Sequence, residues 1–220
     1  MIRYRPTFSL QTGSLVGARA VVDPGEGLAS LQHICRFARG WVAPGVDPVV
    51  VRVPIDHAAL TSSFLLTEVS AALSQSRLAL GSLELLVPPG PVTAMAALQG
   101  MGVRLAVPGS AIGKLTLAQM EELPIDKLIL DPLFVRGLLH DDESAALCAG
   151  LIHLAMELKI RSGADGVDFP LQASFLKDLE ADEATGGFFG PAMEAPAFER
   201  WWRARVAVAP EGVVGEQAQN

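Results

Sequence analysis

Apolar residues recur along the chain in two alternating patterns, short runs typical of strands and longer stretches with helical spacing. Residues 4–10 and 15–22 alternate like two strands, and the segment QTGS at 11–14 between them is a hairpin turn signal. After this hairpin, each short apolar run leads into a stretch of helical periodicity. The pattern predicts an α/β protein that opens with an antiparallel pair of strands.

The later strands and helices alternate with short connections. The further predicted strands are 49–53, 83–87, 103–107, 127–130, 158–163 and 186–189. The predicted helices are 28–38, 60–73, 95–98, 117–120, one starting at 133, 142–157 with Asp142 as its cap, 169–179 and 196–202. About eight strands interleaved with helices predict a (β/α)8 TIM-like barrel over residues 1–205. The tail 206–220 has no pattern, and we expect it to be flexible.

The composition of the chain limits its domain size, its location and the partners it can bind. The chain has 220 residues, half of them hydrophobic, enough for the core of one domain. Its apolar stretches all meet a charge or a breaker before about 18 residues, so we expect no membrane span. Cys35 and Cys148 lie in apolar helical patterns, which indicates reduced thiols and a cytoplasmic protein. The net charge of −7 argues against nonspecific binding to nucleic acid or to an anionic membrane.

One stretch of the chain carries a specific resemblance. Residues 123–135, LPIDKLILDPLFV, read as a buried strand that leads into a helix. The stretch resembles the signature LPID-x-LKID-x-SFV of EAL domains, which hydrolyse cyclic di-GMP. The opening segment YRPTFSLQTGSLVGARAVV, and then GVRLAV, ADGVDF and GGFFGP, are similar to further EAL segments in the same order. The resemblance implies an EAL-type barrel whose first strand is antiparallel to its neighbours.

The resemblance also implies that the family's chemistry is missing. EAL phosphodiesterases hold one or two divalent cations through carboxylates and one amide at the C-terminal ends of the strands. Here Arg19 stands for the glutamate of the EAL triplet, Arg52 for a metal-binding asparagine and Ile129 for a functional lysine. Other positions of the site hold Leu86, Pro89, Pro108, Gly109 and Gly186. We therefore expect a degenerate EAL domain with no catalytic residues, no metal and no cofactor.

Two acids remain at positions of the former site. Asp165 and Asp168 are shortened versions of two glutamates and keep the right functional group. Arg19 and Arg52 could bind a phosphate directly, with Asp131 completing a possible ligand-binding set. Alternatively, the two arginines pair with Asp165 or Asp168 and fill the cavity. We favour pairing, since two acids remain where two bases were gained.

A tryptophan pair near the C-terminus is the remaining candidate for an interaction. Trp201 and Trp202 lie among Arg200, Arg203 and Arg205. An exposed tryptophan beside arginines suits contact with a protein partner. A C-terminal helix that covers the barrel would explain the same residues.

These features give three functional hypotheses. We favour a catalytically inactive EAL-like domain that acts as a protein-interaction and regulatory module in bacterial signalling, with a protein partner of unknown identity. The alternative is a receptor that binds cyclic di-GMP without cleaving it. A residual phosphodiesterase that uses Asp165 and Asp168 comes third. The segment PGSAIGKLTL replaces a loop through which EAL domains dimerise, so we expect a monomer or a weak dimer.

Overall fold

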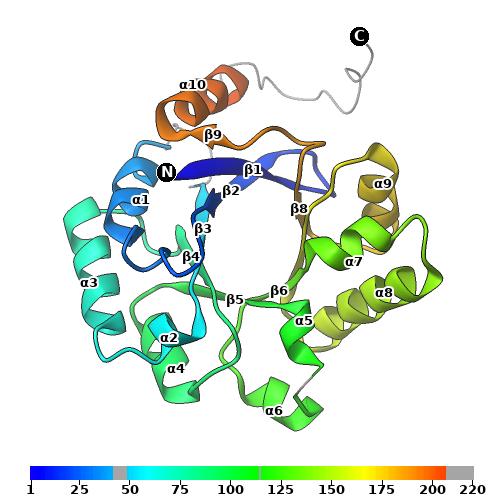
Figure 1. Cartoon of the computed structure of the whole chain (residues 1–220), viewed down its shortest axis with the longest axis horizontal. Helices are drawn as coiled ribbons and strands as arrows, with labels where there is room; N and C mark the ends of the chain where they lie inside the picture. Colours follow the sequence, from blue (N-terminus) through cyan, green and yellow to red (C-terminus); the bar gives the residue numbers. More distant parts are fainter. Residues whose placement is uncertain (42–48, 114, 207–220) are drawn as a thin grey trace.

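The computed structural model of the chain is a closed barrel of strands with helices around its outside (Figure 1). The structure describes residues 1–41, 49–113 and 115–206. Within these residues the strands are β1 Arg3–Ser9, β2 Leu15–Val21, β3 Val50–Pro54, β4 Leu83–Leu86, β5 Arg104–Pro108, β6 Lys127–Leu130, β7 Arg161–Asp165, β8 Glu183–Thr185 and β9 Met193–Glu194. The helices are α1 Leu31–Ala38, α2 His57–Leu60, α3 Leu65–Ser76, α4 Val92–Gly100, α5 Gly109–Ile112, α6 Leu117–Glu122, α7 Pro132–Gly137, α8 Asp142–Glu157, α9 Pro170–Asp178 and α10 Ala195–Val206.

The order of the strands confirms the predicted fold. Strands β2 to β8 lie side by side in sequence order and are parallel, and β1 closes the barrel between β8 and β2. β1 is antiparallel to both of these neighbours, and the short β9 pairs with its other end at Arg3 and Tyr4. The first strand therefore has the orientation that the opening hairpin predicts.

Alternation along the strands gives the barrel two different faces. The outward positions are apolar and pack against the helices, as Leu83 and Leu85 of β4 and Leu128 of β6 do. The inward positions next to them carry charges, among them Glu84 and Lys127, which are almost fully buried. The interior of a TIM barrel is usually filled with branched apolar side chains, and the charged interior of this barrel differs from that pattern.

The prediction of the last parallel strand at 186–189 is wrong. That strand is β8, three residues earlier, and the chain turns directly after it, with the amides of Phe189 and Gly190 donating to the Gly186 carbonyl. A Cβ on Gly186 would lie 1.8 Å from the Val167 carbonyl oxygen, so only glycine fits this close approach. The glycines therefore mark a tight turn against the β7–α9 loop.

Two further boundaries differ from prediction around α8. Asp141 caps this helix in place of Asp142, and its side chain accepts hydrogen bonds from the amides of Glu143 and Ser144. At the other end, Lys159 adopts a left-handed conformation with φ of 57° and turns the chain, so the next strand begins at Arg161. The predicted strand at 158–163 therefore begins later.

α10 lies against β1 and β9 at the edge of the barrel (Figure 1). Its Phe198 is fully buried and packs on Trp41 with the ring centroids 4.6 Å apart. Tyr4 of β1 completes this cluster by an edge contact with Trp41 at 5.0 Å. The helix thus anchors the start of the chain, while residues 207–220 of the predicted tail lie outside the described residues.

Both cysteines are free and buried, as the sequence predicts. Burial raises the pKa of Cys35 to about 12 and that of Cys148 to about 11. These thiols therefore stay protonated near neutral pH and serve as core residues.

The described part of the chain contains no helix long and apolar enough to cross a membrane.

Candidate functional site

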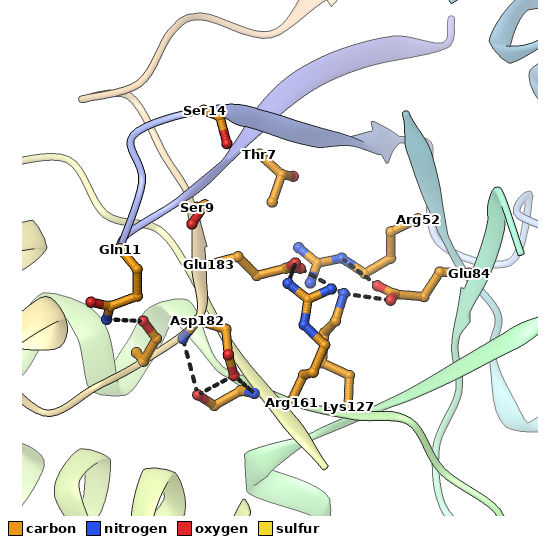
Figure 2. A network of polar contacts seen from close by, with 12 residues as sticks. Thr7, Ser9, Gln11, Ser14, Arg52, Glu84, Lys127, Arg161, Asp182 and Glu183 are labelled. Carbon is orange, nitrogen blue, oxygen red and sulfur yellow. Dashed lines mark hydrogen bonds and ion pairs between the residues drawn. The ribbon is translucent and has the colours of Figure 1, made fainter. Parts of the chain in front are cut away.

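Charged side chains from four strands meet inside the barrel. Figure 2 shows Arg52, Glu84, Lys127 and Glu183 converging from β3, β4, β6 and β8. Lys127 Nζ donates to Glu84 Oε2 at 2.5 Å and to Glu183 Oε1 at 2.7 Å. All four residues are at most 5% exposed. The ammonium group of Lys127 is therefore held between two carboxylates with very little access to water.

The network extends to both ends of the barrel. At the C-terminal ends of the strands, Arg52 forms an ion pair with Asp165, and Arg19 Nε lies 3.3 Å from Asp165 Oδ2. At the opposite end, Arg161 Nη2 lies 3.2 Å from Glu183 Oε2. A longer contact of 3.9 Å between Arg52 Nε and Glu84 Oε1 joins the two halves. One continuous chain of charges thus runs through the barrel.

Bases and acids alternate along this ion network. In sequence of contact its members are Arg19, Asp165, Arg52, Glu84, Lys127, Glu183 and Arg161. Each buried charge has a neighbour of opposite sign, as burial of ions requires. Burial alone would lower the pKa of Arg52, but the carboxylates of Asp165, Glu84 and Glu183 raise it. The guanidinium of Arg52 is therefore charged near neutral pH.

The side chains leave little space between them. A cavity of about 10 Å³ lies beside Thr7, Arg52, Glu84, Lys127 and Glu183. A cavity of that size holds about one water molecule. The ion network thus fills this part of the barrel interior. In other TIM barrels apolar side chains fill it.

Glu183 makes the network sensitive to acid. Burial would raise the pKa of Glu183, but the charges of Lys127, Arg52 and Arg161 outweigh burial and lower it. A lowered pKa in the folded state means that the ionised carboxylate stabilises the fold above the ordinary value of about 4.3. That stabilisation is lost as the pH falls through the lowered pKa.

We expect this loss to be visible in urea unfolding as the pH falls below the ordinary glutamate pKa of about 4.3. The free energy of unfolding should fall more steeply with decreasing pH in the natural chain than in a Glu183→Gln variant, because the variant lacks the titrating group. Glu121→Gln, which changes an exposed carboxylate on α6, is the matched control and should keep the natural slope. Equal slopes in all three proteins would contradict this role of Glu183.

The structure brings some of the predicted site residues together. Arg19 and Arg52 both pair with Asp165, which confirms the pairing that the sequence favours. Asp168 and Asp131 instead bind backbone amides, accepting hydrogen bonds of 2.7 Å from Gly187 in the turn after β8 and from Ser110 in α5 respectively. Asp168 therefore fixes the turn after β8, and Asp131 fixes the start of α5.

The two tryptophans occupy different environments. Trp202 is 2% exposed and belongs to the hydrophobic core. Trp201 is half-buried, and the guanidinium of Arg205 lies 3.9 Å from the centre of its ring. Of the pair, Trp201 alone reaches the surface as a possible partner contact.

Sequence reasoning missed Glu84, Lys127, Arg161 and Glu183 as parts of the site. A signal was present, because Lys127 precedes Ile129 by two residues in one strand and so faces the same side. A single charged residue at an inward position of a short strand is the common feature of Glu84, Lys127 and Glu183. Their meeting depends on closure of the barrel, which brings β4, β6 and β8 together around one axis.

The donors at the mouth do not fit a divalent cation. Magnesium needs several oxygen ligands, whereas Asp165 is surrounded by two guanidinium groups and Ile129 lies on the neighbouring strand. In the described ranges, no three His, Cys, Asp or Glu residues form a group that could hold a metal ion.

The fold and the site define a parallel barrel with one reversed strand and a buried ion network at its centre. The sequence model of the EAL domain matches residues 27–192, so the chain belongs to the EAL domain family. It is 28% identical over 189 residues to the cyclic di-GMP phosphodiesterase NbdA of Pseudomonas aeruginosa, covering 82% of this chain and 24% of NbdA. The chain thus spans about a quarter of that relative's length.

Solved structures share the fold. The structure described as the PaMucR phosphodiesterase in complex with cyclic di-GMP superposes with a TM-score of 0.83 at 23% identity, covering 90% of this chain and 93% of that one. The EAL domain of Mycobacterium smegmatis DcpA superposes with a TM-score of 0.81 at 22% identity, covering 92% and 95%. Both likenesses extend over nearly the whole barrel.

Proposed function

We propose that this chain is an EAL domain that does not hydrolyse cyclic di-GMP and acts as a regulatory module by binding a protein partner. The ion pairs of Arg19 and Arg52 with Asp165 carry this proposal. They place two positive charges at the C-terminal ends of the strands. The resemblance to EAL phosphodiesterases implies that those enzymes hold their metal ions at this end. Loss of the catalytic motifs, which the replaced motif residues of the sequence lead us to expect, is part of the same proposal.

The arrangement of charges supports the loss of metal binding. Arg52 is 4% exposed and cannot move to solvent without leaving Asp165 as a buried carboxylate with one remaining base. Breaking a buried ion pair costs about 3–5 kcal/mol. A divalent cation would have to overcome that cost and the repulsion from two guanidinium groups.

Exposed apolar side chains beside the mouth support the binding of a protein. Leu133 at the start of α7 is 67% exposed, and Phe169 and Leu171 at the start of α9 are 60% and 69% exposed. The two helices are neighbours, since Gln172 Nε2 donates to the Val135 carbonyl at 2.8 Å. Large apolar groups gathered at a surface are typical of interaction sites.

Titration with manganese tests the metal-free site. We expect no saturable binding of Mn²⁺ to the natural chain at submillimolar concentrations, measured by calorimetry. The Arg19→Glu variant should also show no hydrolysis of cyclic di-GMP, because one carboxylate does not remove Arg52 or rebuild the other ligands. Activity gained by this single substitution would show that the metal site is nearly intact and would overturn the proposal.

A receptor for cyclic di-GMP is the second candidate function. The observation in its favour is that the Arg19 side chain is 27% exposed at the mouth of the barrel. The barrel also superposes on that of the PaMucR phosphodiesterase, whose structure is a complex with cyclic di-GMP. Guanidinium groups bind phosphate oxygens directly. Calorimetric titration with cyclic di-GMP without magnesium separates the two candidates, because micromolar binding favours the receptor.

A further inference from the structure

A cavity of about 320 Å³ lies at the bottom of the barrel, where the parallel strands begin. Its charged lining residues are Glu84, Arg104, Asp126, Lys127, Lys159 and Arg161. The volume lies in the range of small-molecule pockets, about 300–1,000 Å³. Because Asp165 is the last residue of β7, this cavity is at the end of the barrel opposite to the mouth.

The floor of the bottom cavity is an ion pair of the network. Glu84 and Lys127 are 1% and 3% exposed, and Lys127 Nζ donates to carboxylate oxygens of Glu84 and Glu183. An ammonium group has three N–H donors, so one donor of Lys127 remains beyond these two. The Glu84 carboxylate at the floor is therefore neutralised by the lysine beside it.

Three further bases form the rim of the bottom cavity. Arg104 is half-buried, and Lys159 and Arg161 are exposed. Arg104 is the register partner of Glu84, and Arg161 is that of Lys127, so both arginines share the inner face of the strands. Figure 2 shows Arg161 beside Lys127 at this end of the network. Bases from β5, from β7 and from the segment before β7 thus surround one space.

The rim bases have few acids to pair with. Within the part of the chain that the structure describes, Arg104 and Lys159 form no ion pair, and Arg161 pairs with Glu183 at 3.2 Å. A guanidinium group has five N–H donors, so Arg161 can keep Glu183 and bind a further acceptor. The rim therefore carries positive charge that this part of the protein does not neutralise.

Asp126, the second acid of the lining, serves another purpose. Its Oδ2 accepts hydrogen bonds from the Leu105 amide at 2.7 Å and from Gln99 Nε2 at 3.1 Å. These contacts tie the start of β6 to β5 and to the end of α4. Asp126 forms no ion pair with a described base, so it does not compete for the rim.

The backbone of Lys159 gives a separate indication. Its φ of 57° lies in the left-handed region, and its amide donates to the Met156 carbonyl at the end of α8. Glycine makes such a turn at lower steric cost than lysine does. The turn itself does not require a lysine, whereas the side chain of Lys159 lines the bottom cavity.

We propose that Arg104, Lys159 and Arg161 bind a small oxyanion with at least two acidic groups in the bottom cavity. Guanidinium and ammonium groups bind carboxylate and phosphate oxygens through charge-assisted hydrogen bonds, and three separate bases match an anion whose charge is spread over several oxygens. The cavity has the volume of about ten water molecules, which is enough for such a compound. Polycarboxylates and diphosphates are the two sources of this chemistry. The site is independent of the proposed function, since it lies at the other end of the barrel.

Calorimetric titration of the whole chain with citrate and, separately, with pyrophosphate tests the site at low salt and without divalent cations. We expect saturable binding of at least one of them with a dissociation constant below about 1 mM. Arg104→Gln and Lys159→Gly should each weaken this binding about tenfold or more, because each removes a charged donor. Arg136→Gln, which changes an exposed arginine of α7, is the matched control and should change the affinity less than about twofold.

The Lys159→Gly variant keeps the test independent of folding. Glycine fits the left-handed turn at this position, so the midpoint of urea unfolding should stay close to that of the natural chain. A loss of binding in this variant therefore reports the missing ammonium group.

The pattern of binding decides the inference. Binding of either probe, weakened in both single variants, supports the site, and the probe that binds more tightly identifies carboxylate or phosphate as the ligand group. No binding of either probe, or binding that survives in the Arg104→Gln/Lys159→Gly double variant, would overturn it. Binding that is lost in Arg19→Gln but kept in that double variant would place the anion at the mouth and would also contradict the inference.

Discussion

Replacement of Lys127 by methionine is expected to lower the free energy of unfolding by about 3–5 kcal/mol, the cost of removing one partner from a buried ion pair. The substitution leaves Glu84 with a single base 3.9 Å away and Glu183 with the half-exposed Arg161. Methionine has nearly the same length as lysine, so the lowered free energy of unfolding reflects the lost charge more than a change in side-chain volume. Urea unfolding followed by circular dichroism measures it.

Two controls separate the network from a general effect of the substitution. Lys177→Met removes an exposed lysine of α9 and should change the stability by less than about 0.5 kcal/mol. The double variant Lys127→Met/Glu84→Gln should be less destabilised than the sum of the single variants, because both members of one pair are then neutral. Additive losses, or a Lys127→Met variant as stable as the natural chain, would contradict a stabilising ion network.

Trp202→Ala is expected to cost about 3–5 kcal/mol, as removal of a buried tryptophan does. The side chain is 2% exposed in the hydrophobic core that joins α10 to the barrel. Trp201→Ala on the same helix should cost less, since Trp201 is only half-buried. Thermal and urea unfolding of the two variants side by side make the comparison.

This pair of variants also distinguishes a loss of stability from a loss of partner binding. Partner binding, assayed with folded protein, should respond to Trp201→Ala if that surface is used, whereas Trp202→Ala should act through stability. A Trp202→Ala variant that unfolds like the natural chain would show that α10 does not depend on this contact, and would contradict its placement in the core.

The periodicity of the sequence predicts most of the barrel. Apolar runs such as 83–87 and 127–130 are visible because their outward residues pack on helices, and the reversed first strand follows from the turn at 11–14. The last parallel strand, β8, escapes this reasoning, since Glu183–Thr185 is short and its inward residues are polar. The segment after it, which begins at Gly186, is predicted to be a strand but forms a turn. Gly186 is needed there because the chain passes very close to the backbone of Val167.

The candidate site is predictable only in part. Alignment by resemblance locates Arg19, Arg52 and Asp165, and opposite charges suggest their pairing. The contact of Lys127 with Glu84 and Glu183 joins residues 43 and 56 positions apart. Such a contact follows from strand register around a closed barrel, and register is not encoded in local periodicity.

We propose that the chain does not carry out metal-dependent hydrolysis of cyclic di-GMP, and direct measurement of product tests this proposal. Purified protein is incubated with cyclic di-GMP and Mg²⁺ or Mn²⁺, the linear dinucleotide is quantified by chromatography, and the phosphodiesterase NbdA serves as the positive control. We predict no product above the rate without protein, because Arg19 and Arg52 surround Asp165 at the mouth. Metal-dependent turnover that Asp165→Asn abolishes would contradict the account.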